Sequence, residues 1–256
     1  MTLAACVALV ERGDPARFAA LRAAPVAARP ALAVLYAFNL EIARAPWVTQ
    51  EPMIAEMRLQ WWRNIIAEAA AGRARAHEVA GPLAALIGRG RIDPAVLDRA
   101  VEARRWDIYR DAFADSGALA EYLEDSAAGL MWASAQALGA GPGAEAAVRG
   151  YGWAAGLAAF LRAVPELQAR GRIPLVDGRP AAVADLARQG LDRLARGRAG
   201  RSTVPKAARP ALLPAWSARP LLALAAAEPQ RVAEGGLVLS EFAQRWGLMR
   251  AAVLGV

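Results

Sequence analysis

Cysteine and histidine are nearly absent from this sequence of 256 residues, which contains one of each, Cys6 and His77. A single cysteine excludes an internal disulfide and a cysteine-based zinc site, because structural zinc sites need several thiolate or imidazole ligands. A single histidine excludes a histidine-rich metal centre and any catalytic triad that relies on a second histidine. The low counts remove these classes of site before any motif is considered.

Long apolar runs are also missing. No stretch of about 18 apolar residues is free of charge, so the sequence predicts no transmembrane helix. The opening MTLAACVALVERGDP lacks a basic region and soon reaches acidic residues, which is not typical of a secretory signal. We expect a cytoplasmic protein, with peripheral association with the inner face of the cytoplasmic membrane as the further possibility.

Alternating runs rich in valine, isoleucine and threonine are nearly absent, so we expect no strands. The apolar residues instead recur at helical spacing, and Asp93-Pro94 is a typical helix start. No linker rich in proline, glycine or serine divides the chain, so residues 1–256 are predicted to form one all-α domain. The predicted helices cover residues 2–11, 14–22, 28–44, 51–71, 77–88, 94–110, 117–138, 143–169, 181–196, 206–213, 217–225 and 230–253.

Acidic residues are missing from the segment 193–227, which carries the whole net charge of +7. Four prolines break this segment into short pieces. We predict that it contacts an anionic membrane surface or an acidic protein, and a solvated basic loop is the simpler alternative. Nucleic acid is not expected, because aromatic residues do not alternate with the basic ones and no binding motif is present. The predicted anionic-surface residues are Arg193, Arg196, Arg198, Arg201, Lys206 and Arg209.

Leucines and Trp216 lie between the basic residues of this segment. Basic and apolar groups in alternation suit a membrane interface, because the apolar groups can enter the headgroup region. The same leucines would equally serve to close a helical bundle, and the sequence leaves both interpretations open.

Three stretches carry a resemblance to a known family. The first is RPALAVLYAFNLEIAR at 29–44, followed by EP at 51–52 and RLQWWRN at 58–64. The second is ARRWDIYRDAFADSGALAEYLEDSAAGLMWASAQALG at 103–139, and the third is GYGWAAGLAAFLRAVPELQARGRIPL at 150–175. In this order and spacing they resemble the squalene/phytoene synthase family. The resemblance implies the isoprenoid synthase fold, a helical barrel around a central cavity.

Enzymes of that family need two aspartate-rich motifs, whose carboxylates hold the magnesium ions that neutralise the diphosphate leaving group. The resemblance aligns the first motif with Ala43, Arg44 and Trp47. It aligns the second with Ala163 and Leu167. Glu41 and Glu166 are the acidic residues nearby, and Pro165 argues against a regular helix there.

Acidic residues elsewhere in the sequence are poor candidates for a substitute metal site. Asp107, Asp111 and Asp115 recur at four-residue spacing, but Asp115 has the position of a helix N-cap. Asp98, Glu102 and Arg105 have the spacing of exposed salt bridges. We therefore do not expect a relocated metal site.

Two functions of different classes follow. The first is a non-catalytic protein that binds an isoprenoid or lipid, or assists assembly of a respiratory complex, because the pattern resembles the branch that includes a mitochondrial complex I assembly factor. On this reading we expect no catalytic residue, metal or cofactor. The second is an active head-to-head prenyl synthase with degenerate motifs, which would require magnesium. The residues predicted to line the remnant ligand pocket are Asn39, Glu41, Arg58, Trp62, Arg162, Glu166, Arg170 and Arg172.

Overall fold

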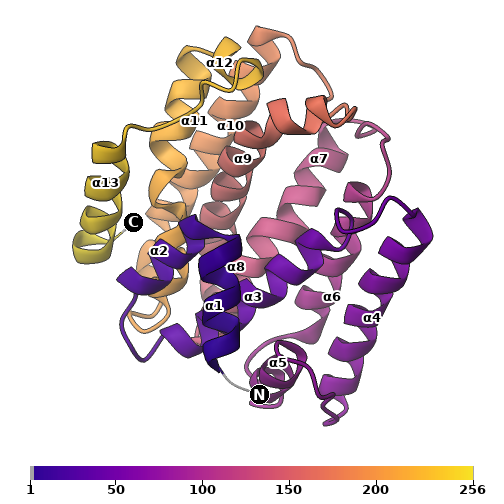
Figure 1. The fold of residues 1–256 in the computed structure, drawn as a ribbon. Coiled ribbons are helices and arrows are strands. Elements are labelled where there is room, and N and C mark those ends of the chain that lie inside the picture. The colour runs from indigo at the N-terminus through magenta and orange to yellow at the C-terminus, as the bar shows by residue number, and fades with distance from the viewer. Residues whose placement is uncertain (1–2, 256) are drawn as a thin grey trace.

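The computed structural model describes residues 3–255, and this range contains helices and no strand (Figure 1). The all-α fold predicted from the sequence is therefore confirmed. None of the helices in this range is both long and apolar enough to cross a bilayer. In chain order the α-helices are α1 (Leu3–Gly13), α2 (Pro15–Ala23), α3 (Arg29–Arg44), α4 (Pro52–Ala70), α5 (Ala80–Ile87), α6 (Pro94–Ala103), α7 (Ser116–Leu123), α8 (Gly129–Ala137), α9 (Glu145–Ala169), α10 (Pro180–Ala199), α11 (Ala218–Ala227), α12 (Gln230–Ala233) and α13 (Glu241–Leu254).

Several predicted boundaries differ from these. The helix predicted over 117–138 is divided by a π-helical turn at Glu124–Ala128, and the one predicted over 206–213 is a 3₁₀ helix at Arg209–Ser217. The helix predicted over 230–253 is two helices, because Gly235 has a positive φ of 73° and Ser240 caps a new start. Thr2, where the first helix was predicted to begin, lies outside the described residues.

The helix predicted over 143–169 is confirmed as α9, and the irregularity expected at Pro165 is not seen. The helix runs without a break from Glu145 to Ala169. A proline inside a helix costs about 3 kcal/mol, because it removes one backbone donor and crowds the preceding turn. Leu161, Val164 and Leu167 are buried on either side of it. Burial of these side chains offsets the cost and keeps this turn helical.

The core is centred on α3 and α9. Every residue from Ala31 to Leu40 of α3 is buried, so this part of the helix has no face exposed to water. A helix that is apolar all round is stable only when other helices surround it. α9 packs against α8 on one side and against α10 and α11 on another, while α4 and α13 lie at opposite edges of the bundle (Figure 1).

Glycines set the distance between α9 and α10. A Cβ atom on Gly197 of α10 would lie 2.9 Å from the carbonyl oxygen of Ala147, and one on Gly150 of α9 would lie 2.9 Å from that of Arg193. Both contacts are with backbone atoms, which cannot move aside singly. The two helices therefore approach as closely as they do because neither carries a side chain at the crossing.

Gly197→Ala should lower the free energy of unfolding by about 1–3 kcal/mol, because α9 and α10 must separate to admit the methyl group. Gly143→Ala is the matched control, since nothing lies within 4 Å of a Cβ atom built there and its φ is not positive. Urea unfolding followed by circular dichroism measures both. Equal stabilities of the two variants would contradict the close crossing.

Candidate functional site

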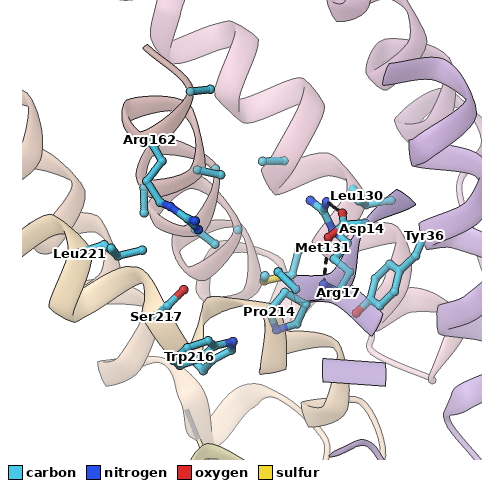
Figure 2. Close-up of a pocket in the computed structure, with 18 of the residues that line it drawn as sticks. Asp14, Arg17, Tyr36, Leu130, Met131, Arg162, Pro214, Trp216, Ser217 and Leu221 are labelled. Atoms are coloured by element: carbon cyan, nitrogen blue, oxygen red, sulfur yellow. Dashed lines mark hydrogen bonds and ion pairs between the residues drawn. The ribbon is translucent and has the colours of Figure 1, made fainter. Parts of the chain in front are cut away.

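A cavity of about 440 Å³ lies between α2, α8, α9, α11 and the 3₁₀ helix Arg209–Ser217 (Figure 2). Small residues of α9 line it, and Ala155, Ala159 and Ala163 leave room beside the helix. Gly152 and Gly156 border it too, but they serve close packing, because Cβ atoms there would collide with Ala128 and Ala127. Apolar side chains from other elements complete the lining and include Leu130, Met131, Leu221 and Leu237. The sequence-based prediction of a cavity within a helical fold is consistent with this arrangement.

Polar groups stand at two sides of the cavity. Asp14 and Arg17 form an ion pair at the start of α2, and Tyr36 of α3 lies beside them (Figure 2). The Tyr36 ring is 3% exposed, and its hydroxyl has no hydrogen-bond partner among the described residues. Burial raises the pKa of the Tyr36 hydroxyl, so the group stays protonated and available as a donor. Arg162 of α9 approaches from the opposite side.

A buried hydroxyl without a partner lowers the stability of the fold, because it loses its hydrogen bonds to water. A ligand in the cavity that accepts a hydrogen bond from this hydroxyl would restore the lost stability. Asp14, Arg17 and Tyr36 were not predicted from the sequence. Tyr36 lies in an apolar helix and looks like any core aromatic there. Only the packing of α2 against α3 reveals that its hydroxyl faces a cavity.

The ends of α3 and α9, where the resemblance places the two metal-binding motifs, meet through aromatic and cationic groups. The guanidinium carbons of Arg170 and Arg172 lie 4.7 and 4.8 Å from the centre of the Trp47 ring. Glu166 is exposed and forms an ion pair with Arg170 one turn away. Ala163 borders the cavity, and Leu167 is buried. The contact between the two helix ends is therefore a cation–π cluster.

A buried polar network lies next to this cluster. The Arg104 guanidinium contacts the Asp107 carboxylate at 3.3 Å, donates to the Tyr122 hydroxyl at 2.8 Å and reaches Asn39 Oδ1 at 3.3 Å. Arg172 donates to the backbone carbonyls of residues 106, 107 and 109. Burial raises the pKa of the Asp107 carboxyl, and its contacts with Arg104 and Tyr122 oppose that shift.

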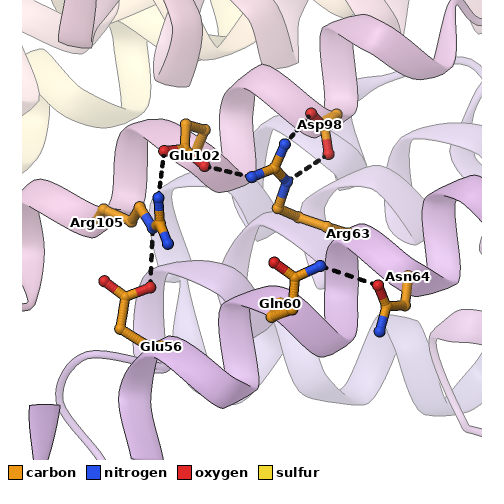
Figure 3. A network of polar contacts seen from close by, with 7 residues as sticks. All are labelled: Glu56, Gln60, Arg63, Asn64, Asp98, Glu102 and Arg105. Atoms are coloured by element: carbon orange, nitrogen blue, oxygen red, sulfur yellow. Dashed lines mark hydrogen bonds and ion pairs between the residues drawn. The ribbon is translucent and has the colours of Figure 1, made fainter. Parts of the chain in front are cut away.

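The acidic residues considered as a substitute metal site have other roles. Asp107 belongs to the buried network, and Asp115 caps α7 by accepting from the Ala118 backbone, as predicted. Asp98 and Glu102 of α6 both bind Arg63 of α4, and Arg105 links Glu102 to Glu56 (Figure 3). These side chains are partly exposed, and they join α4 to α6 near the surface. Within residues 3–255, no three histidine, cysteine, aspartate or glutamate side chains are grouped as metal ligands would be.

Most of the residues predicted for the remnant pocket do not meet at the cavity. Arg162 alone of the eight borders it. Asn39 and Arg172 are in the buried network, while Glu166 and Arg170 are on the surface beside Trp47. Trp62 is 3% exposed and packs edge-on against Phe38, so it belongs to the core. Arg58 is exposed and Glu41 half-buried, and neither lines the cavity.

The segment 193–227 supports the simpler interpretation of its leucines. Leu212, Leu213, Leu221 and Leu222 are all buried, so they close the helical fold and cannot enter a membrane. Arg193 is engaged as well, because it pairs with Glu124 and lies 4.3 Å from the centre of the Trp153 ring. Arg209 donates from Nε to the carbonyl of residue 204, whereas Arg196, Arg198 and Lys206 are exposed.

Asp107→Ala should lower the free energy of unfolding by about 3–5 kcal/mol, because it leaves the Arg104 guanidinium buried without a carboxylate. Replacing both residues with leucine should cost less than the sum of the two single changes. Asp185→Ala is the control, since it breaks an exposed pair with Arg188 and should cost at most about 1 kcal/mol. Urea unfolding measures every variant, including Arg104→Leu and Asp107→Leu made singly, and a cost at Asp107 no greater than at Asp185 would contradict the buried pair.

Known proteins have sequences similar to that of this chain. The chain matches NADH dehydrogenase (ubiquinone) complex I assembly factor 6 of Rattus norvegicus with 24% identity over 169 residues, and its homolog in Drosophila melanogaster with 29% identity over 178 residues. These matches cover 66% and 67% of the chain but only 51% and 53% of the relatives, so the chain spans about half of their length.

Solved structures share the fold. A dehydrosqualene synthase in complex with a ligand superimposes with a TM-score of 0.81 at 15% identity, over 96% of this chain and 93% of that one. Squalene synthase HpnC from Alicyclobacillus acidocaldarius gives a TM-score of 0.74 at 18% identity, over 89% of this chain and 94% of that one. The family model for squalene/phytoene synthase matches residues 10–176, more than half of the sequence. The chain therefore belongs to the squalene/phytoene synthase family.

Proposed function

We propose that this protein is a non-catalytic member of its family, which holds an isoprenoid or a similar single-chain lipid in its cavity and acts with a protein partner in assembly of a respiratory complex. The observation that carries the proposal is the cavity of about 440 Å³, whose apolar walls enclose the unpartnered hydroxyl of Tyr36. Apolar walls with a few placed polar groups are typical of sites for small apolar ligands.

The polar groups suggest how such a ligand lies. The tail would pack along the small residues of α9, between Gly152 and Ala163. A hydroxyl, carbonyl or phosphate oxygen at its head would accept from Tyr36 and approach Arg17. Asp14 neutralises much of the charge on Arg17, which favours a neutral or singly charged head over a diphosphate.

The residues at the ends of α3 and α9 do not fit the magnesium ions that the family's enzymes use. Magnesium requires oxygen ligands in near-octahedral geometry. Ala43, Trp47, Ala163 and Leu167 supply none, so among the described residues Glu41 and Glu166 are the only carboxylates on these helix ends, one from each helix, and Glu166 is paired with Arg170. Arg170 and Arg172 bring positive charge to the place where a cation would have to bind. These observations support the non-catalytic proposal over the degenerate prenyl synthase, and we derive no metal-dependent step.

The assembly role is supported by the names of the two relatives, both complex I assembly factors. Affinity capture from native membranes, with identification of the proteins that co-purify, tests this role. Recovery of respiratory-complex subunits or assembly proteins is expected, and recovery of isoprenoid-synthesis enzymes alone would contradict it.

Incubation with farnesyl or geranylgeranyl diphosphate, magnesium and a nicotinamide reductant should give no squalene or phytoene. Ala163→Asp combined with Leu167→Asp should not create activity, and should lower the free energy of unfolding by about 2–5 kcal/mol, because Leu167 is buried. Gln168→Asp, at an exposed position of the same helix, should change stability by less than about 1 kcal/mol. Metal-dependent product from the unaltered protein would overturn the proposal.

Ala159→Trp should abolish retention of a lipid, because Ala159 lines the cavity and a tryptophan there fills the space beside α9. Ala146→Trp is the control, since Ala146 is exposed on the same helix and does not line the cavity. Organic extraction of each purified variant, followed by mass spectrometry, measures the bound lipid. Equal lipid content in the two variants, or none in the unaltered protein after incubation with farnesol or a lysophospholipid, would contradict a cavity ligand.

A further inference from the structure

The C-terminal helix α13 has its large apolar side chains on the outside. Phe242, Trp246, Met249 and Val253 recur at intervals of four, three and four residues, which places them along one face of the helix. Their exposed fractions are 76%, 52%, 51% and 76%. A helix that packs on a bundle normally buries such a stripe, so this face is arranged for contact with something else.

The inward face of α13 carries Gly247, the half-buried Leu248 and the buried Ala251. A Cβ atom on Gly247 would lie 2.9 Å from the Trp216 ring, and Ala251 is buried. The close contact of Gly247 with the Trp216 ring fixes the rotation of α13 about its axis. Because these residues face inward, Phe242, Trp246, Met249 and Val253 are held outward by the packing and are not exposed by chance.

Basic side chains flank this apolar face on both sides. Arg245 and Arg250 lie next to the stripe on α13 itself, and Glu241 is the only acidic residue of the helix. A hollow of about 450 Å³ beside α13 is bordered by Phe242 and Trp246 and by Arg198, Arg219 and Arg250. A second hollow of about 350 Å³ beside the end of the helix brings Val253 and Leu254 next to Arg201, Lys206 and Arg209.

The acid-free segment 193–227 and the exposed stripe are therefore parts of one surface. The apolar groups come from α13, and most of the positive charge comes from residues far away in the sequence. We propose that α13 and these surrounding basic residues form a face that docks on an anionic lipid bilayer. The proposal is independent of the cavity and of any ligand within it.

A bilayer fits this face better than another macromolecule for two reasons. Aromatic and aliphatic side chains bordered by arginines match the boundary between acyl chains and anionic headgroups, which is the arrangement of interfacial amphipathic helices. The 14 residues of α13 extend for about 21 Å at 1.5 Å per residue, so the helix is too short to cross the hydrocarbon core and would lie along it. The two hollows lie beside the stripe, where phosphate headgroups would meet the guanidinium groups.

Co-sedimentation tests the proposal, using vesicles of phosphatidylcholine alone and vesicles that contain phosphatidylglycerol. The unaltered protein should bind the anionic vesicles, should not bind the neutral ones, and should dissociate as salt screens the charges. Arg219→Ala combined with Arg250→Ala should weaken binding roughly 25-fold, since each basic residue contributes about 5-fold. Phe242→Ser combined with Trp246→Ser should reduce binding by at least as much.

Matched controls separate this face from general effects of charge or apolar exposure. Arg73→Ala combined with Arg89→Ala removes two exposed arginines elsewhere, and Met53→Ser combined with Met57→Ser removes two exposed apolar residues of α4. Both controls should bind as the unaltered protein does. Circular dichroism should show the same melting temperature for the α13 variants, because the altered side chains are exposed.

Several results would overturn the proposal. These are equal binding to neutral and anionic vesicles, no binding to either, or binding that the α13 variants do not weaken. A dimer in light scattering that Phe242→Ser and Trp246→Ser dissociate, together with failure to bind vesicles, would identify the face as a contact between copies of this chain.

Discussion

The small side chains of α9 are the constraint on which the rest of the structure depends. On one side Gly150 meets Gly197, so that α9 and α10 touch through their backbones. On another side Ala159 and Ala163 leave a cavity that larger residues would fill. A single helix thus provides both close packing and empty space.

Arginine side chains supply the positive charge at the C-terminal end of α9. Trp47 from the α3–α4 connection lies against Arg170 and Arg172, and Arg172 ties the chain near residues 106–109 to this end of the bundle. Arg104 and Asp107 form a buried ion pair next to these contacts. Cation–π contacts and a buried ion pair can hold helix ends together without a metal. This is the physical basis for proposing a protein that keeps the fold of a prenyl synthase and uses it for binding.

The cavity and the α13 face are separate features with compatible roles. The cavity suits one apolar chain with a small polar head, whereas the α13 face suits a whole membrane surface. A protein with both would work at a bilayer, where apolar ligands are concentrated and membrane complexes are assembled. Trp216 connects the two, because it lines the cavity and also supports Gly247 of α13. Changes at this ring would therefore affect both.

The sequence by itself determined the fold class, most helix positions and the family, because helical periodicity and ordered motifs are local properties of the chain. It also located the acid-free segment and the cap at Asp115. It predicted the helix at 143–169 but not that the helix stays regular at Pro165, where burial of Leu161 and Val164 overrides a local preference. It failed at 230–253, where Gly235 ends a helix that periodicity would continue. Only the tertiary structure decided that Trp62 belongs to the core, that Tyr36 faces a cavity and that the leucines of 193–227 are buried. It alone brought the basic residues of that segment to the exposed stripe of α13. These outcomes depend on which face of a helix meets a neighbour, and that is set by contacts between residues far apart in the chain.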